Sequence, residues 1–275
     1  MQFVSNRAIE SANMEMSRSS SKCSVCFLQR SCCICGRLAV LKSTLPKQEL
    51  KCHVCLFTHY KEYGKASNTG KLLKFAFPGS VTTFILGNAK DDALLVDKIT
   101  RENTLVLYPG GKSVSLQSVL DRVLQVAGGA ARKWHGDGPD PSGMCAEGVS
   151  VNLVVIDSTW RQSKAMYRWL SSLCPSSTLS QSLSAPPFCF HVNVDSAVEG
   201  GGPSGYLNRR QIFPSKSSTV ESAAYALAVL EGPHGLGCGQ QDAGAMAAAV
   251  LDYCSNALDL SVDGNCTQSG KVRSA

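Results

Sequence analysis

The sequence predicts an α/β fold, in which a mostly parallel sheet is flanked by helices and an N-terminal cysteine-rich segment binds zinc. Short, apolar, β-branched runs alternate along the chain with segments of helical spacing, and no internal repeat is visible. This alternation is typical of parallel strands joined by helices. Five cysteines within the thirteen residues 23–35 predict the metal-binding segment.

The length and composition suit one large domain or two small ones with a substantial core. The chain has 275 residues, of which 44% are hydrophobic and 17% charged. We expect a disordered tail over 1–22, the zinc-binding segment over 23–48, the main domain over 49–260 and a second disordered tail over 261–275.

The first half of the main domain contains three predicted strands and one helix. Residues 50–58 alternate apolar or Cys residues with polar ones, which indicates a strand. Residues 81–86 and 104–108 are short, apolar and bounded by Gly or Pro, as buried strands are. Residues 116–127 have helical spacing. Residues 128–148 are rich in Gly, Pro and Asp, which predicts a surface loop insertion.

The second half begins with a buried strand over 151–156, which leads into a helix that ends near residue 173. Ser218 and Glu221 have the spacing of a capping box and predict a helix to residue 230. The other expected elements are a strand over 188–194, a Gly-rich loop over 196–205 and a helix over 243–258.

We expect a cytoplasmic protein, with the nucleus as the alternative, because we find neither a membrane span nor a secretory signal in the sequence. No run of eighteen apolar residues is present, so we expect no membrane span. Residues 1–22 contain no apolar core of a secretory signal. The cysteines should then stay reduced, and clustered reduced cysteines indicate a metal.

The cysteine spacing indicates a structural zinc site. Cys23 and Cys26 form a CxxC pair, and Cys33 and Cys35 form a CxC pair seven positions later. Four thiolates at this spacing can close a tetrahedral site, with Cys32 as a spare neighbour. The CxxxCxxC spacing of a radical iron–sulfur enzyme is absent.

Cys52 and Cys55 lie in the first predicted strand and are expected to be core residues. Residues three apart on a strand point to opposite faces, so the two thiols would not share an ion.

Positive charge gathers at the same end as the cysteines. Residues 1–75 hold twelve Lys and Arg against four Asp and Glu, whereas the other 200 residues hold fifteen against seventeen. A uniformly basic histone-like chain is thereby excluded. Phosphate neutralisation supplies much of the affinity for RNA, so this segment suits an RNA partner. The basic residues that we expect on its surface include Lys22, Arg30, Arg37, Lys42, Lys47, Lys51, Lys61, Lys65, Lys71 and Lys74.

Asp157 follows a buried strand and precedes a helix, where open α/β sheets bind their ligands. On this segment alone, a functional site and a helix cap with Trp160 in the core are equally favoured. Arg209 and Arg210 lie in a Gly-rich region and could bind a carboxylate or phosphate, or be solvated. The run from Gly110 to Ser113 ends like a P-loop, but the required first Gly is Val106.

Taken in order, these residues resemble the DTW-domain family, which is named for its Asp-x-Thr-Trp motif. The matching motifs are Cys23, Cys26, Cys33 and Cys35; His59 and Glu62; Asn68-Thr69 with Leu72-Leu73; Leu107-Tyr108-Pro109; Asp157-Ser158-Thr159-Trp160 with Gln162; Tyr206 with Arg209-Arg210; and Ser218-Thr219-Val220-Glu221-Ser222. The resemblance covers roughly residues 23–258. Tyr60 stands where the family usually has Pro, and the 128–148 insertion is a further departure.

The resemblance implies a SPOUT-like fold with a C-terminal trefoil knot that holds S-adenosylmethionine. It implies transfer of the 3-amino-3-carboxypropyl group of this co-substrate to N3 of a tRNA uridine, with release of 5′-methylthioadenosine. The partner would be tRNA, and we expect a monomer. The alternatives are a SPOUT-like RNA methyltransferase and a zinc-dependent RNA-binding protein without catalysis.

The resemblance also implies roles for individual residues. Asp157 would accept the N3 proton or orient the uracil, next to Thr159 and Trp160, and Trp160 would stack on the uracil or line the pocket. The residues expected to bind the co-substrate are Tyr108, Pro109, Gly110, Ser158, Arg209, Ser218 and Thr219, and those expected to bind RNA are His59, Glu62 and Arg210.

Overall fold

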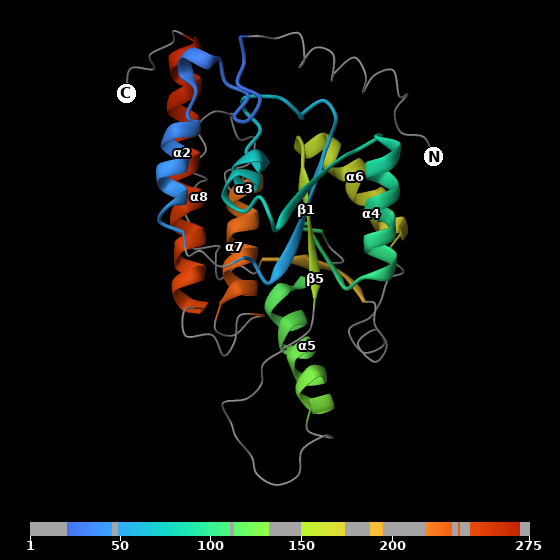
Figure 1. The fold of residues 1–275 in the computed structure, drawn as a ribbon. Helices are drawn as coiled ribbons and strands as arrows, with labels where there is room; N and C mark the ends of the chain where they lie inside the picture. Colours follow the sequence, from blue (N-terminus) through green and yellow to red (C-terminus); the bar gives the residue numbers. More distant parts are fainter. Residues whose placement is uncertain are drawn as a thin grey trace.

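The computed structural model describes residues 21–45, 49–110, 113–131, 150–173, 188–194, 218–232, 236 and 243–269. Within these ranges, six strands form one sheet in the order β2-β1-β5-β3-β6-β4 (Figure 1). Each neighbouring pair of strands is parallel. The expected α/β fold with a mostly parallel sheet is confirmed.

The strands lie where short apolar runs predicted them. They are β1 (Cys52–Thr58), β2 (Val81–Ile85), β3 (Thr104–Leu107), β4 (Val114–Ser115), β5 (Val151–Asp157) and β6 (Cys189–Asn193). Only the two-residue strand β4 was not expected. The alternation in β1 suggested one polar face, but six of its seven residues are buried, because β1 lies between β2 and β5 and helices cover both faces.

Helices cover both faces of the sheet and make three layers (Figure 1). One face packs against α4 (Ala89–Arg101) and α6 (Trp160–Leu173). The other face carries α3 (Gly70–Ala76), α5 (Leu116–Ala131), α7 (Thr219–Glu231) and α8 (Ala243–Ser269). The short turn η1 (Arg30–Cys32) and helix α2 (Cys35–Lys42) contact α8 from outside.

Cys52 and Cys55 are core residues, as the strand geometry predicted. Cys52 is 1% exposed and packs in the cluster under α3, α7 and α8, whereas Cys55 is fully buried in the cluster under α4 and α6. The two thiols therefore lie on opposite faces of the sheet and cannot share a metal ion.

Two helices are longer than predicted. Helix α5 continues through Gly128 and Gly129 to Ala131, so the first four residues of the expected loop insertion are helical. Helix α8 runs to Ser269, past the boundary at 260 where a tail was expected, because residues 243–269 contain no proline to end it. The rest of the insertion, the 196–205 loop, residues 1–20 and the segments needed to trace a knot lie outside the described residues.

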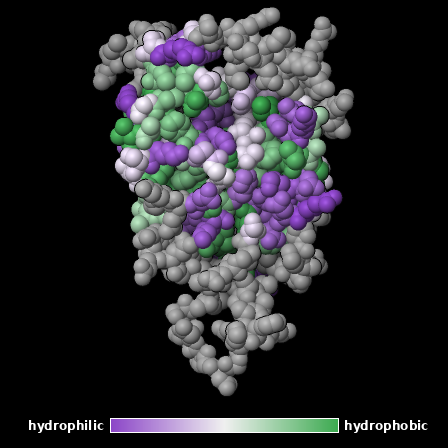
Figure 2. All heavy atoms as spheres, viewed as in Figure 1, coloured by the Kyte–Doolittle hydropathy of each residue, from purple (hydrophilic) through white to green (hydrophobic). Residues whose placement is uncertain are grey.

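Helix α4 was not predicted, although its signals are present. The Asn88 side chain accepts hydrogen bonds from the backbone N–H groups of Lys90 and Asp91, as an N-cap does. Leu95 and Ile99, one turn apart, are buried against the sheet. Figure 2 shows hydrophilic side chains gathered over the outer side of α4. Among the described residues, no helix is long and apolar enough to cross a membrane.

Candidate functional site

The carboxyl ends of β1 and β5 form the centre of the candidate site. The two strands are paired so that Thr58 lies opposite Asp157, the last residue of each strand. The chain after β1 leads to α3 on one face of the sheet, and the chain after β5 enters α6 on the other. When the chain leaves two neighbouring parallel strands toward opposite faces of the sheet, a crevice forms between the strand ends. In α/β proteins, ligands bind in this crevice.

Asp157 is the central carboxylate of this site. Its side chain is 4% exposed and lies on the α3 side of the sheet. Oδ2 accepts hydrogen bonds from Oγ1 of Thr58, at 3.4 Å, and from the side-chain amide of Asn68. The Thr219 side chain, at the start of α7, is a further hydrogen-bond partner. The carboxylate therefore joins β1, β5, α3 and α7.

Burial raises the pKa of Asp157 above its ordinary value, and the hydrogen bonds from Asn68, Thr219 and Thr58 only partly oppose this. The negative charge of Glu62 acts in the same direction as burial. A carboxylate with a raised pKa is a stronger base than one in water, which suits proton uptake.

Gly70 allows the start of α3 to approach Asp157. A Cβ atom at Gly70 would lie 2.7 Å from Oδ2 of Asp157 and 2.9 Å from Cδ1 of Leu56. The Asn68 side chain also accepts a hydrogen bond from the backbone N–H of Lys71, at 3.2 Å, which fixes its orientation. The segment 68–71 is thus shaped around the carboxylate.

Thr159 begins α6 as a capping residue. Its backbone N–H and its hydroxyl donate to Oε1 of Gln162, at 3.0 and 2.7 Å. The Ser158 hydroxyl donates to the carbonyl oxygen of Thr159, at 3.2 Å. Trp160 is 38% exposed, so it is not the core anchor that was one of the two expectations.

The turn after β3 lies at the same edge of the sheet. Its Tyr108 ring stacks on Tyr167 of α6, with ring centroids 3.9 Å apart. The Ser113 hydroxyl donates to the carbonyl oxygen of Tyr108 at 2.5 Å and accepts from the backbone N–H of Gly110 at 3.1 Å. Pro109 lies within this turn, whose backbone groups at Tyr108 and Gly110 are hydrogen-bonded within the protein.

Ser218 and Thr219 have different partners. Ser218 is the N-cap of α7 and forms the predicted capping box with Glu221, so its hydroxyl already accepts a backbone hydrogen bond. The Thr219 side chain is directed to Asp157. Arg209 and Arg210, expected at the co-substrate and RNA sites, lie outside the described residues.

His59 and Glu62 follow β1. The Nδ1 atom of His59 accepts the backbone N–H of Lys61 at 3.1 Å, and its ring stacks on Tyr60 with centroids 4.7 Å apart. Burial lowers the pKa of His59, which favours the neutral imidazole with its proton on Nε2. Glu62 is 3% exposed and pairs with Lys65 at 2.9 Å, so its carboxylate has a partner within the protein.

A pocket of about 530 Å³ opens between the end of β1 and α6. It lies on the α6 side of the sheet, opposite the carboxylate of Asp157. Its lining combines basic, polar, aromatic and apolar side chains: His59, Tyr60, Lys61, Leu86, Thr159, Arg161, Gln162, Ala165, Met166 and Trp169. Neither this pocket nor the place of Arg161 in its lining was predicted from the sequence.

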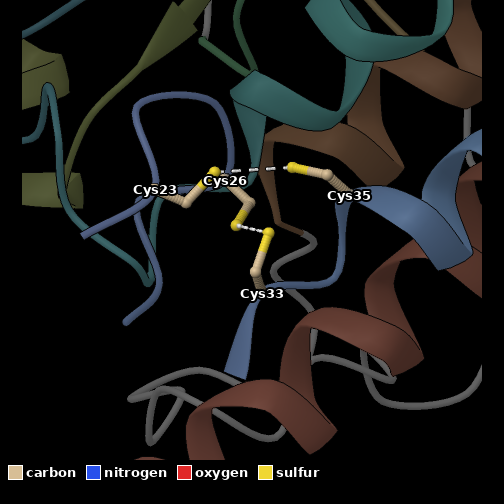
Figure 3. Close-up of side chains that lie close together, drawn as sticks. All are labelled: Cys23, Cys26, Cys33 and Cys35. Carbon is tan, nitrogen blue, oxygen red and sulfur yellow. Dashed lines mark hydrogen bonds between the residues drawn. The ribbon is translucent and has the colours of Figure 1, made fainter. Parts of the chain in front are cut away.

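The four predicted metal-ligating cysteines come together (Figure 3). Their Sγ atoms all lie within 4.8 Å of one another, and Cys23–Cys35 and Cys26–Cys33 are 3.6 and 3.8 Å apart. A tetrahedron with zinc–sulfur distances of about 2.3 Å has edges of about 3.8 Å, so the cluster has the geometry of a zinc site. Of the doubled pair, Cys33 belongs to this cluster and Cys32 does not.

The clustered thiols differ in their pKa values, because burial raises the pKa of Cys26 and of Cys35. Burial opposes ionisation of Cys23, but hydrogen bonds from the backbone N–H groups of Cys26 and Val25 and from neighbouring thiols lower its pKa to about 6. Phe27, next to this turn, has a positive φ of 60°, a conformation that a bulky residue rarely adopts. One thiol is therefore readily ionised, whereas the case for a metal site rests on the positions of the four sulfur atoms.

Lys71 connects the cysteine cluster to Asp157, which corrects one expectation from the sequence. Lys71 was expected at the basic surface, but it is only 9% exposed. Its Nζ donates to the carbonyl oxygens of Cys26, at 2.5 Å, and Ala66, at 2.6 Å, and lies 5.6 Å from the ring centroid of Phe27. Burial lowers its pKa to about 8, while the nearby thiols and Asp157 favour its charged form.

Comparison with protein families matches residues 20–256 of the chain to the DTW domain. This match includes the cysteine cluster, the pocket and Asp157. Searches of curated proteins and of solved structures found no match.

Proposed function

Because the chain belongs to the DTW-domain family, we propose that it transfers the 3-amino-3-carboxypropyl group of S-adenosylmethionine to N3 of a uridine in tRNA. The products would be 3-(3-amino-3-carboxypropyl)uridine and 5′-methylthioadenosine. The observation that carries this proposal is the position of Asp157, which belongs to the family's motif and is buried at the crevice between β1 and β5.

The reaction needs a base and a precise arrangement of the two substrates. A bond forms between N3 and the terminal carbon of the aminocarboxypropyl arm, and the carbon–sulfur bond breaks with its electron pair on sulfur. S-adenosylmethionine supplies a sulfonium leaving group, which becomes a neutral thioether. The N3 proton must move to a base, and a positioned base contributes roughly 10²–10⁴-fold to such a step.

Asp157 is the proposed base, since burial raises its pKa. Its hydrogen bonds to Thr58, Asn68 and Thr219 fix the orientation of the carboxylate. If Asp157 only oriented the uracil and took up no proton, its own pKa would not control the rate. The pH dependence of turnover therefore distinguishes proton uptake by Asp157 from orientation of the uracil.

The co-substrate would lie where β3 ends and α7 begins. The turn of Tyr108, Pro109 and Gly110 would line the site at the end of β3, and Thr219 lies in the first turn of α7, where backbone N–H groups favour a carboxylate. The family implies a SPOUT-like knot, which would hold the co-substrate. Zinc would hold the CxxC turn in place and would take no part in the transfer.

The test is product analysis with purified full-length protein, S-adenosylmethionine and unmodified tRNA. Aminocarboxypropyl-uridine and methylthioadenosine, detected by mass spectrometry, would support the proposal. Methyl-nucleoside and adenosylhomocysteine would instead show a methyltransferase, and RNA binding without either product would show a non-catalytic binding protein.

The matched variants are Asp157→Asn and Asp259→Asn. Asp259 is an exposed residue of α8, so its substitution should leave turnover unchanged. Asp157→Asn should lower turnover at least a hundredfold while S-adenosylmethionine binding, measured by calorimetry, is retained. Normal turnover of Asp157→Asn would rule out its role as the base.

A further inference from the structure

The pocket between β1 and α6 has a distinct charge. Its ten lining residues include Lys61 and Arg161 but no Asp or Glu. Both cations are exposed, and neither forms an ion pair with a carboxylate within the described part of the chain. Two cations in a pocket without acidic groups attract an anion.

The inner part of the pocket is apolar and partly aromatic. Leu86 and Met166 are buried at 6% and 1% exposure, and the half-buried Trp169 ring packs on Phe57 with centroids 5.3 Å apart. Thr159 and Gln162, which hydrogen-bond to each other, add polar groups to the lining. The pocket therefore combines a flat apolar surface with an anion-binding edge.

A nucleotide within an RNA strand has the matching chemistry. Its base presents an apolar face that stacks on aromatic and apolar side chains, and its phosphates carry negative charge. S-adenosylmethionine is a poor match, because its sulfonium and ammonium groups outweigh its carboxylate and give it a net positive charge. The volume of about 530 Å³ lies within the range of nucleotide-sized sites.

We propose that this pocket binds a nucleotide of the tRNA strand, with its base against Met166 and Trp169 and its phosphates on Lys61 and Arg161. This inference rests on the proposed function for the identity of the RNA. Because the carboxylate of Asp157 lies on the opposite face of the sheet, the bound nucleotide is a neighbour of the modified uridine. Its binding would hold the strand across the crevice.

The test is the salt dependence of tRNA binding by the full-length protein. The double variant Lys61→Glu/Arg161→Glu should bind unmodified tRNA at least tenfold more weakly. The slope of log affinity against log salt should fall by about 1.4, as expected for two lost phosphate contacts to a single strand. Lys164→Glu, an exposed residue of α6 that does not line the pocket, is the matched control and should have a much smaller effect.

A second variant tests the apolar part without changing charge. Ala165→Phe would fill the pocket from α6, so it should weaken tRNA binding and leave the salt slope unchanged. Binding of S-adenosylmethionine should be normal in both variants. Loss of S-adenosylmethionine binding, or tRNA binding equal to that of Lys164→Glu, would overturn the assignment.

The result of this binding test can be distinguished from the result of the product analysis that tests the proposed function. Loss of tRNA affinity in the pocket variants would support the pocket even if the wild-type protein formed no aminocarboxypropyl-uridine. Product formation by the wild type, together with unchanged tRNA binding by both variants, would support the function and refute the pocket.

Discussion

The ammonium group of Lys71 hydrogen-bonds to the main-chain carbonyl oxygen of Cys26, a residue of the metal-ligating cluster. The backbone N–H of Lys71 donates to the Asn68 side chain, whose amide in turn donates to Asp157. The turn of the cysteine cluster and the candidate catalytic carboxylate are thus linked through α3. Loss of metal should therefore affect the geometry around Asp157.

We expect Cys33→Ser and Cys32→Ser to differ sharply. Cys33→Ser removes one of four clustered thiols and should lower zinc affinity by more than tenfold and lower the melting temperature, because zinc binding contributes folding free energy. Cys32→Ser should retain one zinc per chain. Metal content and thermal unfolding measure both, and equal loss in the two variants would refute the assigned ligand set.

Lys71→Met should destabilise the protein by about 1–3 kcal/mol, since it leaves the buried carbonyl oxygens of Cys26 and Ala66 without their donor. Zinc should also dissociate faster, because the turn that carries Cys26 loses its contact with α3. Urea unfolding and transfer of zinc to a chelator measure the two effects. Lys90→Met, at an exposed position of α4, is the control and should change neither quantity.

The sequence predicted the buried strands and the cysteine cluster, because each depends on residues that lie close together in the chain. Runs such as residues 151–156 are apolar and β-branched because both faces of the sheet are covered, and Asp157 at the end of such a run marks the ligand-binding edge. The CxxC and CxC spacings likewise predicted the four clustered thiols.

Contacts between distant segments could not be predicted in this way. Asn68 and Asp157 are 89 residues apart, and Lys71 and Cys26 are 45 apart. The sequence showed Lys71 as one more cation in a basic segment, and nothing local indicated its burial. The pocket depends on the placement of α6 beside the end of β1, which only the assembled sheet determines.

Gly70→Ala and Gly36→Ala form a matched pair. At Gly70 the new Cβ would lie 2.7 Å from Oδ2 of Asp157, so we expect destabilisation of about 1–3 kcal/mol and reduced turnover. At Gly36, the second residue of α2, nothing lies within 4 Å of the new Cβ, so the substitution should not destabilise the protein. Urea unfolding compares the variants, and a stable, active Gly70→Ala protein would contradict the close approach.

Glu231 and Glu102 should give opposite pH dependences of stability. Glu231 is 3% exposed and accepts the backbone N–H groups of Lys51 and Cys52, at 3.0 and 3.2 Å, and burial raises its pKa above its usual value despite these bonds. A raised folded-state pKa contributes stability that is present below the unfolded pKa and is lost as the pH rises through the folded pKa. In Glu102, a hydrogen bond from Asn152 lowers the pKa, so its contribution is present above the unfolded pKa and is lost as the pH falls through the folded one.

Glutamine at either position removes the titration, so the contribution of the variant side chain to stability does not depend on pH. Relative to the wild type, Glu231→Gln should therefore become more stable as the pH rises from acid to neutral. Glu102→Gln should become less stable over the same interval, because it lacks the contribution that the wild type gains. Urea unfolding across this interval measures both slopes. Slopes of the same sign would show that burial does not control the ionisation of Glu231, and comparison with the wild type cancels the shared titration of Asp157 and the cysteine cluster.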